Sequence, residues 1–168
     1  MSLFILDTNF FIQSHRITYP LDVATTFWQK IKKLCLENKI ISIDKVRDEI
    51  FKNDDELKKW IEQNIPEEFF KSTETLQVIS EYQKVVQWAN SKSNHYVQKA
   101  INDFLRYENA DAWIVAYAIS FNDNCQIVTQ EKSEPNRKNK IKIPEVCDAF
   151  NIQYKNIIEM FRLLGETF

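Results

Sequence analysis

The chain has 168 residues, of which 44% are hydrophobic and 27% are charged, and its formal net charge at pH 7 is −2. This balance excludes a disordered or fibrous chain, and the length favours one domain, because a domain usually has roughly 100–200 residues. A net charge this close to zero does not indicate a nucleic-acid partner. It does not exclude one either, because a divalent metal ion can neutralise an acidic site.

The numbers of glycine, cysteine and histidine residues exclude several classes of binding site. The one glycine is Gly165, so no Gly-rich phosphate-binding loop can be written anywhere in the chain. The three cysteines and two histidines form no CxxC, HExxH or mixed Cys/His motif, which argues against a zinc site and against a disulfide scaffold. The apolar N-terminal segment has no basic start and contains Asp7. We therefore expect no signal peptide, no membrane association and a cytoplasmic location.

Short apolar runs alternate along the chain with segments of helical periodicity. The first run, Leu3–Leu6, is typical of a strand buried on both faces. Further strands are predicted at 40–43, 126–129 and 140–143. Helices are predicted at about 22–37, from Asp44 onward, after Asp54 and ending before Pro66, at about 73–90 and at about 94–107. Three more are predicted from the cap Asn109 onward, from Pro144 onward, and at about 155–164.

This alternation predicts a parallel α/β sheet whose strands are joined by right-handed helical crossovers. We expect residues 1–168 to form a single domain, because no repeat, low-complexity tract or linker divides them. The long helical stretch at about 54–107 is then an insertion or lobe on that domain.

Four acidic residues occupy positions where a carboxylate is costly. Asp7 ends the first buried strand, and Glu131 follows the third predicted strand. Glu49 borders the apolar stripe of its helix, and Asp111 lies in the first turn of a strongly apolar helix. Parallel sheets bind ligands beyond the carboxyl ends of their strands, so we expect Asp7 and Glu131 on the same edge.

Each acid also has an ordinary structural interpretation. Asp7 is suited to a turn, and Asp111 is suited to the positive end of a helix dipole. Glu49 and Glu131 could be solvated surface residues. Together, however, convergent carboxylates repel one another unless a cation neutralises them. Ligands that are all oxygen select Mg²⁺, Mn²⁺ or Ca²⁺ over zinc. A metal-activated water is a nucleophile for attack on phosphorus.

The segments FILDTNFFI, ENADAWIVAYA and VTQE, together with the helix that carries Glu49, resemble the PIN domain family of metal-dependent nucleases. The resemblance covers residues 3 to about 150. It implies a three-layer α/β/α fold with a short, mostly parallel sheet of about four to five strands. Many members are toxins of prokaryotic toxin–antitoxin pairs.

Carried over residue by residue, the resemblance assigns catalysis and the binding of one or two Mg²⁺ or Mn²⁺ ions to four acids, with four supporting residues. The acids are Asp7, Glu49, Asp111 and Glu131, and the supporting residues are Thr8, Asn9, Thr129 and Glu134. The family commonly has Asp at the fourth position, where this chain has the longer Glu131. Glu134 is therefore an alternative fourth ligand.

A basic segment follows the fourth acid, and contacts from it to phosphate would position RNA without reading its sequence. The candidate residues are Lys132, Arg137, Lys138, Lys140 and Lys142. The alternative interpretation is a solvated loop, as most charge runs are. His15 and Arg16 are further candidates for substrate contact or for an ordinary turn.

The main functional hypothesis is an endoribonuclease of the toxin type, with RNA as substrate, DNA as a close variant, and an antitoxin or a second copy as protein partner. A second hypothesis is a non-catalytic PIN-like module that binds RNA or protein. A third is a haloacid-dehalogenase-like phosphatase. Its acid would fall on Asn9, which cannot donate a proton as a carboxylic acid does.

Overall fold

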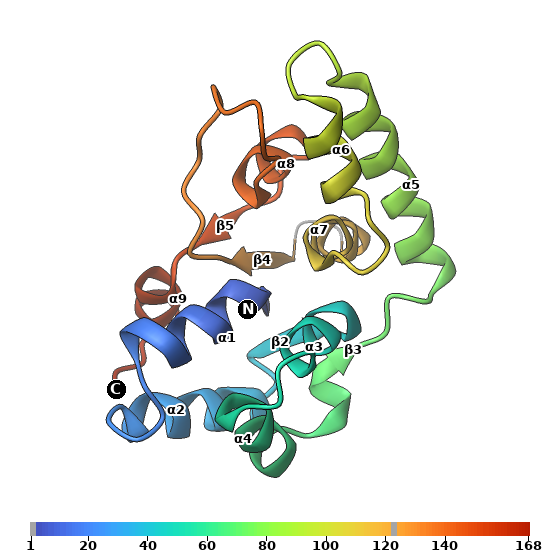
Figure 1. Ribbon diagram of the computed structural model, residues 1–168. Coiled ribbons are helices and arrows are strands. Elements are labelled where there is room, and N and C mark those ends of the chain that lie inside the picture. Colours follow the sequence, from blue (N-terminus) through green and yellow to red (C-terminus); the bar gives the residue numbers. More distant parts are fainter. Residues whose placement is uncertain (1–2, 122–123) are drawn as a thin grey trace.

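The computed structural model describes residues 3–121 and 124–168. Its centre is one five-stranded sheet in which all neighbouring strands are parallel, in the order β3-β2-β1-β4-β5. The strands are β1 (Leu3–Leu6), β2 (Ile40–Ile43), β3 (Phe70–Lys71), β4 (Cys125–Val128) and β5 (Tyr154–Lys155). Figure 1 shows them between the helices.

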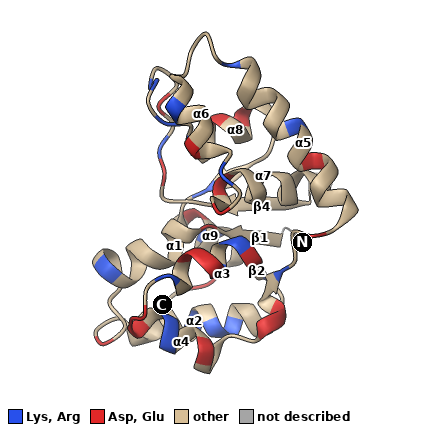
Figure 2. Ribbon diagram, turned by 45° about the vertical axis from the view of Figure 1, so that its right-hand side comes forward, with Lys and Arg blue, Asp and Glu red and all other residues tan. Residues whose placement is uncertain are grey.

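Helices and short helical turns join the strands. They are α1 (Thr8–Gln13), the π-helical turn η1 (Ser14–Thr18), α2 (Thr25–Leu36), α3 (Asp44–Phe51), α4 (Glu56–Asn64), the 3-10 turn η2 (Glu67–Phe69), α5 (Leu76–Ser91), α6 (Gln98–Phe104), α7 (Ala110–Ser120), α8 (Ile143–Ala149) and α9 (Ile157–Leu164). In Figures 1 and 2, α2 and α4 lie to one side of the sheet, and α5, α6 and α8 lie to the other. The sheet thus forms the middle layer of an α/β/α arrangement.

The central strands are the most apolar segments of the chain and form the middle of the core. In β2 all four residues are buried, and in β1 only Leu3 is partly exposed. Such strands can hide both faces only when helices cover both, as in a parallel sheet with helical crossovers. The register places Leu6 beside Val128 and Phe4 beside Ile40, so the carboxyl ends of β1, β2 and β4 lie at one edge.

Three strands are confirmed at or within one residue of their predicted positions, but the strand predicted at 140–143 is wrong. Its Lys-Ile-Lys-Ile alternation does describe burial, because Ile141 and Ile143 are buried. The segment nevertheless pairs with no strand and leads into α8 instead. The fifth position in the sheet is taken by Tyr154–Lys155, and the last helix accordingly begins at Ile157, not at 155.

The middle of the chain is helical, as predicted, with one addition. Between α4 and α5, β3 pairs with β2 and extends the sheet. Asp44 at the end of β2 holds the segment that follows, because its side chain accepts hydrogen bonds from the backbone N and the hydroxyl of Thr73. Residues 54–107 therefore contribute an edge strand to the sheet as well as helices. None of the described helices is both long and apolar enough to cross a membrane.

Candidate metal centre

Asp7 stands at the junction of β1 and α1, where a strand passes directly into a helix. It caps α1, since its Oδ1 accepts a hydrogen bond from the backbone N of Phe10 at 2.6 Å. The pairing of β1 with β4 places Thr129 beside it, and the Thr129 hydroxyl donates to Asp7 Oδ2 at 2.6 Å. Both carboxylate oxygens are therefore held in place by the fold.

The Asp7 side chain is held in a site that disfavours its charge. Only 2% of the residue is exposed. Burial, aided by the charges of Glu131 and Glu49 and opposed by the hydrogen bonds from Thr129 and Phe10, raises the pKa of Asp7 from 3.8 to about 7. A carboxylate perturbed by burial and by like charges is typical of a functional site.

Glu49 joins three elements at the same edge. It lies in the second turn of α3, where its Oε2 accepts a hydrogen bond of 2.5 Å from the Thr8 hydroxyl on α1. Its Oε1 accepts a hydrogen bond of 2.8 Å from the backbone N of Ala110, the first residue of α7. Glu49 therefore links the N-terminus of α7 to α1 through these two hydrogen bonds. It is not a solvated surface residue.

Asp111 is half-buried and lines the cleft at this edge. Asn109 caps α7 by accepting a hydrogen bond from the backbone N of Asp111, which fixes the start of the helix. Burial raises the pKa of Asp111 well above its usual 3.8. The charges of Glu131, Glu49 and Asp7 add to that rise, and the charge of Lys140 opposes it. No hydrogen bond or ion pair reaches the Asp111 carboxylate from residues 3–121 or 124–168.

Glu131 completes the group, but its oxygens are already engaged. Its side chain is 5% exposed, and Oε1 accepts from the Lys140 ammonium at 2.7 Å. Oε2 accepts from the backbone N of Ile143, at the start of α8, at 2.9 Å. Glu131 thus ties both ends of the loop between β4 and α8 together, a role that the sequence did not indicate.

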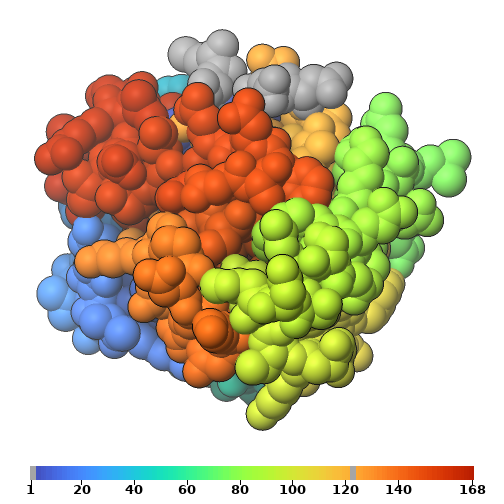
Figure 3. Space-filling model, turned by 90° about the horizontal axis from the view of Figure 1, so that it is seen from above, coloured from blue at the N-terminus to red at the C-terminus, as the bar shows by residue number. Residues whose placement is uncertain are grey.

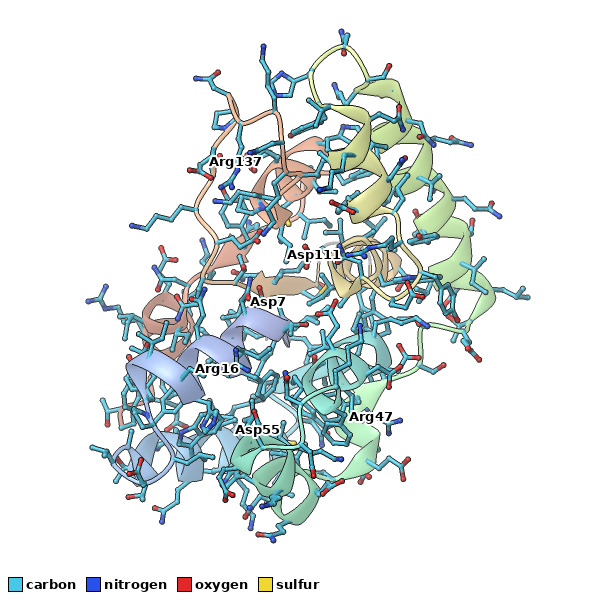
Figure 4. The ribbon with its side chains drawn as sticks, in the orientation of Figure 1. Asp7, Arg16, Arg47, Asp55, Asp111 and Arg137 are labelled. Carbon is cyan, nitrogen blue, oxygen red and sulfur yellow. The ribbon has the colours of Figure 1, made fainter. Side chains whose placement is uncertain are left out.

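Glu134, the alternative fourth ligand, is placed elsewhere. Its carboxylate pairs with Lys142 at 2.6 Å and with Arg137 at 2.8 Å on the outer part of the loop. These hydrogen bonds lower the pKa of Glu134 to about 2. Figure 4 shows Asp7 and Asp111 together at the centre of the molecule and Arg137 out on that loop. Glu131, and not Glu134, is the acid that the fold brings to the cluster.

A cleft of about 610 Å³ opens over this edge and is lined by Thr8, Asn9, Glu49, Lys52, Arg106, Glu108, Asn109, Asp111 and Lys140. Lys140 is the predicted basic residue that reaches it. The sequence analysis missed Lys52, just after α3, and Arg106, between α6 and α7. Nothing in their local sequence distinguishes them from other surface cations, because only the crossing of these elements brings them to the cleft.

The rest of the basic segment lies away from the acids. Backbone N of Val97 donates to the Lys138 carbonyl, and the His95 ring contacts the Arg137 carbonyl, so the loop is attached to the connection between α5 and α6. Figure 3 shows this orange segment beside the yellow-green one. Lys132 lines a different cleft, which is described below. His15 and Arg16 belong to the π-helical turn.

The side chains at this site carry the oxygen ligands that a hard divalent cation prefers. Four carboxylates gather at one edge with hydroxyl and amide oxygens around them, and no histidine or cysteine lines the cleft. Within the part of the chain that the structure describes, no three Asp, Glu, His or Cys side chains already surround one position at metal-binding distance. Binding would therefore require side-chain adjustment around Asp111, the carboxylate without a partner.

Comparison with known proteins gives a family and a fold. Residues 4–168 match the model of a family described as a domain of unknown function, DUF4411. No curated protein matches the sequence. A chain in the crystal structure of VapBC2 from Rickettsia felis, bound to a DNA fragment from their promoter, superposes with a TM-score of 0.53 at 14% identity. The match covers 92% of this chain and 98% of that one. At this identity it shows the fold alone, and the predicted PIN-like α/β fold is confirmed.

Proposed function

The chain belongs to the DUF4411 family, and from this premise we propose that it is a metal-dependent endoribonuclease that uses Mg²⁺ or Mn²⁺. The observation that carries the proposal is the Asp111 carboxylate. It has no protein partner among the described residues and it faces a cleft beside three other acids. A carboxylate left in that state is disfavoured unless a cation binds there.

The four acids have different parts in this proposal. Asp111 and Asp7 would be the main ligands, because Asp111 is unpartnered and Asp7 is fixed rigidly by Phe10 and Thr129. Glu49, oriented by Thr8, would be a ligand or would orient water. Glu131 is an outer ligand, since it would have to exchange a bond to Lys140 or Ile143 to reach the metal directly.

When bound, the metal ion supplies charge neutralisation and an activated water for in-line attack on phosphorus. The chain's own residues supply position. Thr129 and the start of α1 hold Asp7, Asn109 sets the first turn of α7, and Lys140 brings a positive charge beside Asp111. Lys52 and Arg106 line the same cleft, where they can contact the phosphates that flank the cleaved bond.

The toxin role is part of the proposal. It is supported by the PIN-like fold and by the fold neighbour, VapBC2, which was crystallised on DNA from its own promoter. For this chain we infer an antitoxin protein as partner and action in the cytoplasm.

The deciding experiment is cleavage of labelled single-stranded RNA, with DNA of the same sequence in parallel, in Mg²⁺, in Mn²⁺ and in EDTA. We expect cleavage of RNA only with metal, and a loss of at least about a hundredfold on Asp111→Asn or Asp7→Asn, a typical scale for the loss of a charge-stabilising group. Asp148→Asn is the matched control, because Asp148 is exposed on α8 and lines neither cleft. Full activity of Asp111→Asn would refute the assignment.

A specific observation favours one alternative, a non-catalytic module that binds RNA. Asp7, Glu49 and Glu131 each accept hydrogen bonds from the protein on both oxygens, which an entirely structural cluster would also show. The same assay separates the two. A module would bind the RNA but leave it intact in Mg²⁺ and in Mn²⁺, and Asp111→Asn would leave that binding unchanged.

A further inference from the structure

A second and larger cleft, of about 800 Å³, lies on the other side of Glu131. Its walls come from α1 and η1, from the segment after β4, from the end of β5 and from the start of α9. Gln13, Tyr19, Tyr154 and Gln130 give it polar groups and aromatic edges. Its size lies within the range of ligand pockets, roughly 300–1,000 Å³.

In this cleft the acidic side chains have partners among the described residues, whereas the basic side chains do not. Lys132, Lys155 and Arg162 line it, and none of them forms an ion pair or side-chain hydrogen bond with residues 3–121 or 124–168. Its two acids do have partners. Glu131 binds Lys140 and Ile143 N, and Glu159 accepts from the backbone N of Asn156 in the capping box of α9. The cleft therefore offers free positive charge to an anion.

The two clefts share no lining residue, but their walls are linked by side-chain contacts of the residues that follow β4. Thr129 lines the second cleft, and its hydroxyl donates to Asp7. Glu131 lines it as well, and its ion-pair partner Lys140 lines the first cleft. A polyanion that occupies both clefts would pass directly over the acids. Cations flank that path on both sides, Lys52 and Arg106 on one and Lys132, Lys155 and Arg162 on the other, and of these Arg106 pairs with Asp103 at 4.0 Å.

We propose that the second cleft binds the sugar-phosphate backbone of the RNA strand beyond the cleaved bond, with Lys132, Lys155 and Arg162 contacting its phosphates. This inference rests on the proposed function, since it identifies where the remainder of that substrate lies. Contacts of this kind carry no sequence information, so the cleft sets affinity and the direction of the strand. The sequence pointed only to Lys132, because Lys155 and Arg162 lie far from the basic segment along the chain.

The test measures binding without cleavage. A fluorescent single-stranded RNA is titrated with the full-length protein in EDTA at several salt concentrations, and binding is followed by anisotropy. For Lys155→Gln with Arg162→Gln we expect roughly tenfold weaker binding. The slope of log K against log salt should be lower by about 1.4, because each phosphate contact to a single strand contributes about 0.7.

The matched control is Lys92→Gln with Lys99→Gln, which removes the same charge from two cations that line neither cleft and form no ion pair with the residues that the structure describes. It should change the slope by much less. Arg162 is exposed on α9, so Arg162→Gln alone provides a folded variant if the double variant is unstable. Equal affinity and slope for the double variant and the control would overturn the inference.

Cleavage by the wild-type protein separates this inference from the proposed function. If RNA is cleaved with metal while the two double variants bind it equally, only the second-cleft assignment fails. If RNA binds as expected but no metal supports cleavage, the nuclease proposal fails and the second cleft remains an RNA site. If the wild-type protein binds no RNA, both fail. Binding of inorganic phosphate or a mononucleotide with the same affinity as RNA would also overturn the assignment of the second cleft.

Discussion

At the scale of single residues, the site combines one unpartnered carboxylate with three that the fold holds in place. Asp111 has no partner among the described residues, whereas Asp7, Glu49 and Glu131 are fixed by two hydrogen bonds each. In the proposed metal site, the three fixed acids would orient the cation, and the unpartnered acid would supply most of the affinity for it. This arrangement costs stability in the absence of metal, as sites built for function often do.

The loss of stability that this site causes can be measured at Asp7. Because its pKa in the folded protein is about 7 and its ordinary value is 3.8, the folded state holds this proton more tightly than the unfolded state. The contribution of Asp7 to stability therefore falls as pH rises from about 4 to about 7, by up to about 4 kcal/mol at 1.36 kcal/mol per pH unit. Asp7→Asn cannot ionise and keeps an acceptor for Phe10.

We therefore expect Asp7→Asn to be more stable than wild type at pH 8 and nearly equal to it at pH 4, as measured by urea unfolding in EDTA. Asp55→Asn makes the same change at the N-cap of α4, where the side chain is half-buried and accepts from Lys58. It controls for the effect on a helix cap. An Asp7→Asn protein less stable than wild type at pH 8 would contradict this account.

At the scale of elements, the loop between β4 and α8 depends on Glu131. Glu131→Gln keeps an acceptor for Ile143 but loses the ion pair with Lys140. We expect a loss of about 1–3 kcal/mol in the free energy of unfolding, as for other buried hydrogen bonds to charged groups. Cleavage should fall less than in Asp111→Asn, because we propose Glu131 only as an outer ligand.

Glu134→Gln is the matched control in the same loop. Its pairs with Lys142 and Arg137 are half-exposed, and such pairs contribute about 0–1 kcal/mol. Chemical denaturation and the cleavage assay measure both variants. A larger effect of Glu134→Gln on both quantities would place Glu134, and not Glu131, at the site.

The start of α7 is a second element on which the site depends. Asn109 accepts a hydrogen bond from the backbone N of Asp111 and donates one to the carbonyl of Asp103. Asn109→Ala should cost about 0.5–2 kcal/mol, as loss of an N-cap does, and should also reduce cleavage because Asp111 loses its fixed position. Thr75→Ala removes the cap of α5, far from the cleft, and should cost stability without a comparable loss of cleavage.

At the scale of the whole molecule, the proposed metal binding would be linked to folding. A ligand that binds only the folded state stabilises it by about 2.7 kcal/mol at a concentration a hundred times its Kd. We expect Mn²⁺ to raise the Tm of wild type, and EDTA to reverse the rise. Asp111→Asn should show little rise, and KCl of matched ionic strength should not reproduce the effect. An equal rise in both proteins would place the metal elsewhere.

The net charge of the molecule does not reveal the positive charge that lines its clefts. The net charge is −2, and Figure 2 shows acidic and basic segments spread over most elements. Composition therefore does not indicate a polyanion as substrate. The proposal of an RNA substrate rests instead on the two clefts, which collect cations from the end of α3, the α6–α7 connection, the loop after β4, β5 and α9. This gathering of cations exists only in the folded protein, where the elements that carry them pack together.

The sequence by itself determined the central strands and the positions of two acids of the candidate site. Leu3–Leu6 and Ile40–Ile43 are apolar on both faces, which leaves a buried parallel strand as their stable form. Asp7 follows such a strand, and Asp111 follows the helix cap Asn109, so local pattern was enough to place these two. Glu49 was less determined, because its contacts with Thr8 and Ala110 come from two other elements.

Only the tertiary structure decided the remainder. The two-residue strands β3 and β5 are too short to carry a pattern, and Lys140–Ile143 alternates like a strand although it has no neighbour to pair with. The choice of Glu131 over Glu134, and the arrival of Lys52, Arg106, Lys155 and Arg162 at the clefts, depend on where distant segments cross. Local sequence fixes which face of an element is buried, whereas the position of a polar side chain against another element is set by packing.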